Sequence, residues 1–200
     1  FSVMDIERFD LERWQSVHEH DVEINLSESG VHPLRLQEII ETADLEALLG
    51  QELGYPQTNG TVQLRERVAA LYDGASAANV LVTNGGSEAN FVACWHLIEP
   101  GDEVVVFEPF YENYGPDAIL SGAVPRYVTL HEPDWTFDPD ALAAAFNDRT
   151  GAIIINTPNN PTGKVFTREE LTTIAELCQR WDVLAITDEI YEHIIYDGCR

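Results

Sequence analysis

Two clusters of polar residues whose side chains could take part in chemistry lie toward the end of the sequence. Each cluster follows an apolar run. Asn160 lies in an Asn-Pro-Thr-Gly segment soon after residues 152–155, and Asp188 and Tyr191 follow residues 183–186. Both runs are rich in β-branched residues, and a helix is predicted between them, which is typical of neighbouring parallel strands buried on both faces. Because open α/β sheets bind ligands at the carboxyl ends of their strands, we expect the chemistry of the protein at these clusters.

A glycine-rich segment provides a third candidate, suited to an anionic group. Gly85, Gly86 and Ser87 lie between a predicted strand at residues 80–83 and a predicted helix at residues 87–97. Backbone N–H groups at the start of a helix, together with the helix dipole, favour a bound phosphate. The two glycines permit close approach and Ser87 can add a hydroxyl. A simple helix N-cap is the alternative for Ser87, since a Gly-Gly-Ser turn alone is common.

The elements that must position these residues alternate regularly from residue 79 onward. Thr167 and Glu170 form a capping box that starts the helix after the Asn-Pro-Thr-Gly segment. Before these elements, the apolar pattern of residues 36–49 predicts one further helix. The expected strands are residues 80–83, 104–107, 127–130, 152–155 and 183–186, and the expected helices include residues 87–97, 111–120 and 138–146. Asp138 should cap the last of these helices, with Pro139 in its first turn. This alternation predicts an α/β fold with right-handed crossovers, a mostly parallel sheet and helices on both faces.

The composition excludes some classes of partner. The formal net charge is −24, from 35 acidic and 11 basic residues, and such a balance repels nucleic acid and anionic membranes. Lys164 is the only lysine, and acidic residues dominate the expected surfaces, so we interpret the charge as an adaptation to high salt. An ordinary acidic cytosolic protein is the alternative, and a melting curve against KCl would distinguish the two. With neither a signal peptide nor an apolar run of about 18 residues in the sequence, we expect a cytoplasmic protein.

Cysteines and histidines suggest no further chemistry. The three cysteines are widely spaced and show no disulfide framework, zinc spacing or redox motif. His18 and His20 could begin a metal site, but no third ligand lies near them in the sequence, so we expect no metal.

The Asn-Pro-Thr-Gly segment, followed after the next strand by Asp188 and Tyr191, resembles the cofactor-binding core of class I and II aminotransferases. These are fold-type I enzymes that use pyridoxal 5′-phosphate (PLP). The resemblance spans roughly residues 50–196 and implies a homodimeric enzyme that moves an amino group between an amino acid and a 2-oxo acid.

The resemblance also implies a role for each candidate residue toward PLP. Asp188 would face the ring nitrogen, and Asn160 and Tyr191 would bind the phenolic oxygen. Tyr111 would stack on the ring, with Phe110 and Tyr114 as packing residues. The remaining implied roles are phosphate binding by Gly85, Gly86 and Ser87, phosphate binding across a dimer interface by Tyr55, and lining of the substrate pocket by Gly30.

One requirement of PLP chemistry is not met by this sequence. Lys164 directly follows the Asn-Pro-Thr-Gly segment, where the family has no aldimine lysine. In the family that lysine, and the arginine that holds the substrate carboxylate, lie further along the chain. We therefore expect an N-terminal fragment of a longer protein, inactive alone. Residues 1–50 would form an arm and part of a small domain, and residues 51–200 an incomplete PLP-binding large domain.

Two alternatives remain open beside the aminotransferase interpretation. A fold-type I lyase or synthase would keep the same cofactor residues, and a PLP-sensing, aminotransferase-like domain of a transcription regulator would be no enzyme. The sequence does not identify the amino acid or the 2-oxo acid.

Overall fold

The computed structural model describes residues 6, 8–40, 42–196 and 198. The chain divides into two compact units. The sheet unit comprises residues 1–11 and 84–200, and the helical unit comprises residues 12–83. The predicted boundary near residue 50 concerns the domains of the family and stays a prediction.

The secondary structure of the described residues alternates from α5 onward as expected. In chain order the elements are α1 (Asp10–His18), α2 (Leu36–Ile39), α3 (Thr42–Leu49), α4 (Val62–Ala69), the 3₁₀ helix η1 (Ala77–Asn79), α5 (Gly86–Leu97), β1 (Glu103–Glu108), α6 (Tyr114–Leu120), β2 (Val124–Thr129), α7 (Pro139–Ala145), β3 (Thr150–Asn156), α8 (Arg168–Trp181) and β4 (Leu184–Asp188).

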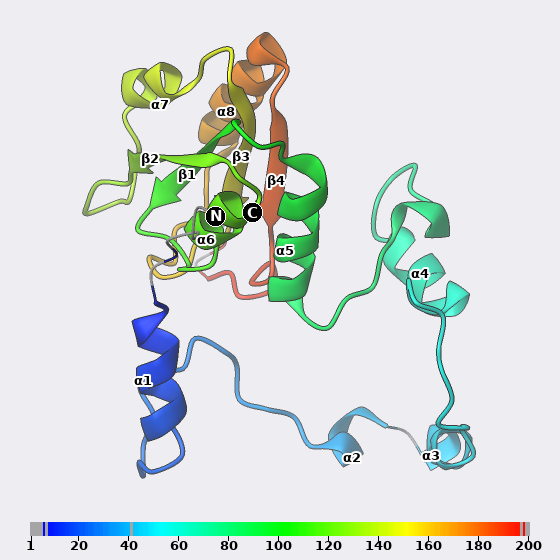
Figure 1. Ribbon diagram of the computed structural model, residues 1–200. Helices are drawn as coiled ribbons and strands as arrows, with labels where there is room; N and C mark the ends of the chain where they lie inside the picture. The colour runs from blue at the N-terminus through cyan, green and yellow to red at the C-terminus, as the bar shows by residue number, and fades with distance from the viewer. Residues whose placement is uncertain (1–5, 7, 41, 197, 199–200) are drawn as a thin grey trace, which may run out of the picture. The chain divides into compact units, whose positions relative to one another are not determined.

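The sheet unit is built on a four-stranded parallel sheet with the order β2-β1-β3-β4 (Figure 1). Val105 of β1 pairs with Ile153 of β3, which pairs in turn with Ala185 of β4. One helix joins each pair of consecutive strands, namely α6, α7 and α8. Parallel strands need such crossovers, and their carboxyl ends therefore all lie at the same end of the sheet. The predicted α/β fold with a parallel sheet is confirmed.

Helices cover both faces of this sheet because the side chains of the strands alternate. On one face, Val105 and Ile153 belong to a core cluster with Leu142 of α7 and Ile174 of α8. The opposite face carries a second cluster, composed of Cys94, Ile98, Val104, Val106, Tyr114, Ala118, Ala123, Ala152 and Ile154. Burial of each such Val or Ile side chain stabilises the fold by roughly 1.5–3 kcal/mol.

The helix starts follow the caps expected from the sequence. Thr167 accepts a hydrogen bond from Glu170 N, and the Glu170 side chain accepts one from Thr167 N, which completes the predicted capping box of α8. Asp138 caps α7 in the same way by accepting a hydrogen bond from Asp140 N, and Pro139 occupies the first turn. These caps fix where the loops between strands and helices end.

Two expectations about strands are wrong. Residues 80–83 form no strand, because none of the described residues pairs with them in a ladder. Val82 N instead donates a hydrogen bond to Asn59 O in a loop contact of the helical unit. The strand β4 is not buried on both faces, since Leu184 is 48% exposed. It lies at the edge of the sheet, whereas β3 is central and buried as predicted.

The helical unit contains short helices in place of one expected long helix. The sequence pattern over residues 36–49 predicted continuous helix, but Ile40 is extended (φ −95°, ψ 120°) and separates α2 from α3. Further along, Arg65 of α4 donates hydrogen bonds to Gly60 O and Ala77 O, which ties the helix to the loop on either side. No helix among the described residues is long and apolar enough to cross a membrane.

Candidate functional site

Asp188, the last residue of β4, lies at the centre of a hydrogen-bonded cluster in the sheet unit. Asn90 Nδ2 of α5 donates to Asp188 Oδ2 at 2.7 Å, and the Tyr114 hydroxyl of α6 donates to the same oxygen at 2.9 Å. The other oxygen, Oδ1, accepts a hydrogen bond from Ile190 N at 3.1 Å. The carboxylate is therefore held by donors from two helices and from the turn that follows its own strand.

The donors to Asp188 carry no charge. Burial first, and then the neighbouring Asp188, raise the pKa of Tyr114 well above its ordinary value, so the hydroxyl keeps its proton at neutral pH. Within the part of the chain that the structure describes, no ion pair joins Asp188 to a lysine, arginine or histidine. Among the described residues, the Asp188 carboxylate therefore has uncharged hydrogen-bond donors and no ion pair.

Asn156, at the end of β3, joins the two polar clusters. Its Nδ2 donates to Asp188 O at 3.0 Å, and its Oδ1 accepts a hydrogen bond from Asn160 N at 2.6 Å. Asn160 Nδ2 in turn donates to the Tyr191 hydroxyl at 3.3 Å. The structure therefore brings Asn160, Asp188 and Tyr191 together at the carboxyl ends of the strands, as the sequence predicted.

The loop that carries Asn160 is closed by its own backbone. Asn159 N donates to Lys164 O at 2.8 Å, Gly163 N donates to Asn159 O at 2.7 Å, and Gly163 has a positive φ of 71° that favours glycine. Asn159 is buried, and its Nδ2 donates to Thr162 Oγ1 at 2.9 Å and to Pro109 O at 3.2 Å. These bonds fix the loop against the segment that follows β1.

Lys164 has a structural role. Its Nζ lies 2.9 Å from Glu170 Oε1, and the side chain is only 9% exposed. Nζ also lies 5.9 Å from the ring centroid of Phe166. The ammonium is thus committed to α8, which agrees with the expectation that Lys164 is not a cofactor lysine.

The segment after β1 carries Tyr111, whose predicted role as the stacking residue stays a prediction. Tyr111 is partly exposed, and its ring meets the ring of Tyr114 edge to face with centroids 5.9 Å apart. Phe110 instead stacks on Tyr127 of β2 at 5.3 Å, with the planes 6° apart. Phe110 is therefore a packing residue, as expected. Tyr114 was also expected to be a packing residue, but in addition it binds Asp188 directly.

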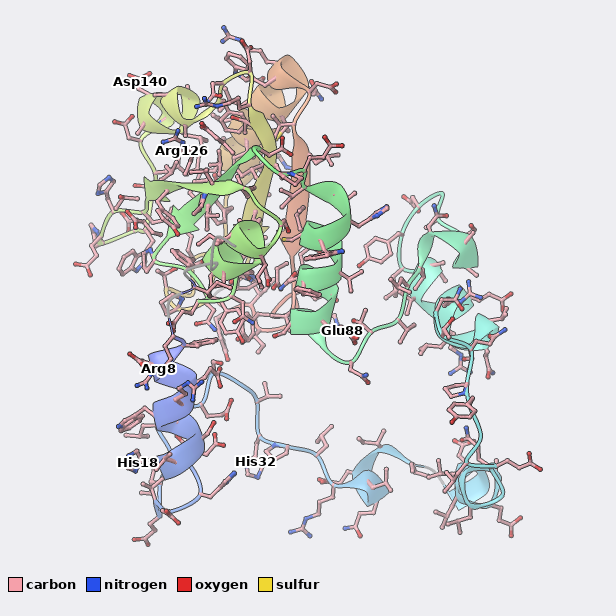
Figure 2. All side chains as sticks on the ribbon, in the orientation of Figure 1. Arg8, His18, His32, Glu88, Arg126 and Asp140 are labelled. Atoms are coloured by element: carbon pink, nitrogen blue, oxygen red, sulfur yellow. The ribbon has the colours of Figure 1, made fainter. Side chains whose placement is uncertain are left out.

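The glycine-rich turn opens α5. Gly85 is the N-cap residue with φ 88°, α5 begins at Gly86, and Ser87 is exposed in the first turn. Ser87 is therefore not the N-cap, which removes that alternative. Glu88, which is labelled in Figure 2, lies in the first turn of α5 and accepts a hydrogen bond from Asn84 N. An acidic residue at this position is favourable because the start of a helix carries a partial positive charge.

The same turn lies beside the end of β4. A Cβ atom at Gly86 would stand 3.7 Å from Ile190 Cδ1, and one at Gly85 would meet no atom within 4 Å. A side chain at Gly85 would therefore meet no neighbour, whereas one at Gly86 would contact the residue that follows β4 by two positions.

Two predicted site residues lie in the helical unit. Tyr55 is fully exposed, and Gly30 N donates a hydrogen bond to Glu28 Oε1 at 2.9 Å. Their predicted roles toward a cofactor or substrate stay predictions.

Sequence reasoning missed Asn90, and it assigned no hydrogen bond to Asn156. Asn90 is only 9% exposed, on a helix whose other buried residue is Cys94. A buried polar side chain in an apolar helix needs a partner, and this was the available signal.

The donor set fits the groups of PLP. The open start of α5 suits a phosphate, Asp188 suits a protonated ring nitrogen, and the Asn160–Tyr191 pair can donate to a phenolate oxygen. The part of the chain that the structure describes contains no group of three or more His, Cys, Asp or Glu side chains that could hold a metal ion.

Comparisons with known proteins agree with this geometry. Residues 22–200 match the family described as aminotransferase class I and II. Human kynurenine–oxoglutarate transaminase 1 is 47% identical over 131 residues, which cover 60% of this chain and 31% of that protein. The chain therefore spans less than half the length of this curated relative.

Solved structures give the same result at the level of the fold. An N-succinyldiaminopimelate aminotransferase from Mycobacterium tuberculosis has a TM-score of 0.72 and 40% identity, covering 79% of this chain and 43% of that one. A PLP-dependent aminotransferase from Streptococcus suis has a TM-score of 0.85 and 30% identity, covering 93% of this chain and 52% of that one.

Proposed function

We propose that the protein is a PLP-dependent aminotransferase, because the chain belongs to the class I and II aminotransferase family. It would move an amino group between an amino acid and a 2-oxo acid. The observation that carries this proposal is the Asp188 carboxylate, held by uncharged donors next to the Asn160–Tyr191 pair.

Each part of the site has a defined task in this proposal. Asp188 holds a proton at the ring nitrogen, because an adjacent carboxylate favours the charged form of that nitrogen. Asn160 and Tyr191 donate hydrogen bonds to the phenolic oxygen and so orient the ring, and Tyr111 covers one face of it. When bound, PLP supplies the electron sink for the substrate carbon.

The phosphate would be bound by the backbone of Gly85 and Gly86 and by the hydroxyl of Ser87. This assignment is supported by the positive φ of Gly85, which favours glycine, and by the helix that starts directly after it.

Two further residues enter the proposal through the family. Tyr55 would reach the phosphate of a second subunit, which requires a homodimer, and Gly30 would line the substrate pocket. The full exposure of Tyr55 in the single chain is compatible with such a contact.

The experiment is a half-reaction with the full-length protein purified with PLP. Each member of a panel of amino acids, including kynurenine, is added without a 2-oxo acid, and the absorbance spectrum and the released products are recorded. Conversion of the bound PLP to pyridoxamine phosphate, with one 2-oxo acid formed per site, is the expected result. A bound-cofactor band that no donor converts would contradict transamination and favour a lyase or a PLP sensor.

A further inference from the structure

Asn90 is a buried polar residue for which neither the Asn-Pro-Thr-Gly segment nor the glycine-rich turn gives a reason. Its side chain is 9% exposed, and it lies on α5 one turn before the fully buried Cys94. Burial of an amide without a partner is costly, so its hydrogen bond at 2.7 Å to Asp188 Oδ2 accounts for its position.

This hydrogen bond is one of two that end on the same oxygen. The Tyr114 hydroxyl reaches Asp188 Oδ2 from α6 at 2.9 Å, and Asn90 reaches it from α5 at 2.7 Å. A single donor leaves a carboxylate free to rotate about its last side-chain torsion. Two donors from separate helices restrict that rotation, and the Ile190 N–H bond to Oδ1 restricts it further.

The charges around this carboxylate point to the kind of group it is prepared for. Both side-chain donors are uncharged, and among the described residues no lysine, arginine or histidine pairs with Asp188. The protein therefore holds the orientation of the anion and leaves its charge without a counter-charge. A cationic N–H group is the natural partner of such an anion.

We infer that Asn90 is a positioning residue that holds the Asp188 carboxylate in the orientation required by the ring nitrogen of PLP. The inference rests on the proposed function and extends it by one residue, which acts only through Asp188. Asn90 fixes the orientation of the carboxylate, and Asp188 provides the negative charge that faces the ring nitrogen.

The test uses two forms of the cofactor that differ only at the ring nitrogen. Kd is measured for PLP and for 1-deaza-PLP, in which C–H replaces that nitrogen, with the full-length protein and its Asn90→Leu variant. The ratio of the two Kd values reports the Asp188 contact, because all other contacts of the ligands are shared.

In Asn90→Leu we expect the preference for PLP over 1-deaza-PLP to fall by about tenfold, as for loss of one hydrogen bond to a charged group. The Kd of 1-deaza-PLP should change little. An unchanged preference, or an equal rise of both Kd values, would overturn the inference, because a purely structural role predicts that result.

Cys94→Ala is the matched control, since it perturbs the same buried side of α5 without touching Asp188. It should leave the preference for PLP unchanged, and a tenfold loss there as well would assign the effect to general loosening of the helix. If leucine prevents folding, Asn90→Ala removes the donor without overpacking and carries the same expectation. A wild-type protein that binds neither ligand would instead overturn the proposed function.

Discussion

Two aspartates of the sheet unit have opposite environments: Asp188 is bound by Tyr114 of α6, and Asp117 is part of α6. Asp188 receives hydrogen bonds from Asn90, Tyr114 and the backbone, whereas Asp117, on α6 itself, is buried with Oδ2 lacking any hydrogen-bond partner among the described residues. Desolvation raises the pKa of Asp117 from 3.8 to about 6. The nearby Cys94 thiol has a pKa of about 12, raised by burial and then by Asp117, so it stays protonated and unreactive. Position in the fold, and not residue type, therefore separates the hydrogen-bonded carboxylate of Asp188 from the carboxylate of Asp117, whose Oδ2 has no partner among the described residues.

Asp117 should lower the stability of the protein as the pH rises. A folded-state pKa above the unfolded value means that the folded state binds the proton more tightly, so stability falls between about pH 4 and pH 6 and stays low above that range. We expect Asp117→Asn to stabilise the protein by about 1–2 kcal/mol more at pH 8 than at pH 5. Urea denaturation of variant and wild type at the two pH values measures this, and an equal difference at both would contradict it.

The sequence predicted the site residues that belong to a motif and missed the one that does not. Asn160, Asp188 and Tyr191 were found because they follow two recognisable strands, and the structure brings them together at the carboxyl ends of the strands. Asn90 lies 98 residues from Asp188, and a single asparagine in a helix gives no sign of a partner so distant in the chain. Periodicity describes which face a residue occupies, but not which side chain it meets there.

Among the elements of secondary structure, the sequence predicted the helix caps well and the pairing and burial of the strands poorly. The capping box of α8 and the cap of α7 depend on residues a few positions apart, and both are confirmed. Whether an apolar run is a buried strand depends on its neighbours in the sheet. That is why β3 is buried, the edge strand β4 is half exposed, and residues 80–83 are not a strand.

The amino end of the sheet is held by a single buried carboxylate. Glu103, at the start of β1, accepts hydrogen bonds from Arg126 of β2, which is labelled in Figure 2, at 2.7 Å. It also accepts hydrogen bonds from Asn147 at 2.8 Å and from Arg149. These donors, Arg126 above all, lower the pKa of Glu103 from 4.5 to about 2. The side chain thereby connects β1 to β2 and to the segment before β3. These contacts lie at the amino ends of the strands, whereas the candidate site lies at their carboxyl ends.

Glu103→Gln should destabilise the protein at neutral pH. A depressed pKa contributes stability that is present above about pH 4.5 and is lost as the pH falls toward 2. The shift corresponds to at most about 3 kcal/mol, and we expect about 1–2 kcal/mol because both guanidinium partners are solvent-exposed.

Urea denaturation at pH 7 measures this loss. Glu176→Gln, which removes an exposed carboxylate on α8, is the control and should change stability by less than about 0.5 kcal/mol. Equal effects of the two substitutions would show that the Glu103 network adds nothing beyond net charge.

At the scale of the whole molecule, the net charge of −24 dominates the electrostatics. We propose that this charge reflects adaptation to high salt. Repulsion between charges more than about 8 Å apart is already largely screened at physiological ionic strength, where the Debye length is about 8 Å. A protein adapted to salt should continue to gain stability well beyond that point.

The thermal midpoint of the full-length protein should therefore rise steadily with KCl up to about molar concentration, where the Debye length is about 3 Å. Sucrose at equal osmolality is the control for solvent exclusion and should give a smaller rise. A midpoint that is independent of KCl above about 0.2 M would contradict the proposal and indicate an ordinary acidic protein.

Asp188, Asn160 and Tyr191 are proposed to form part of a PLP site. A titration of PLP into the full-length protein and its Asp188→Asn variant, followed by the absorbance of the bound cofactor, tests this proposal. We expect saturable binding by the wild type and a loss of about 10–100-fold in affinity in the variant, which keeps the shape of the side chain but lacks its charge. Equal affinities, or no bound-cofactor band in either protein, would contradict the account.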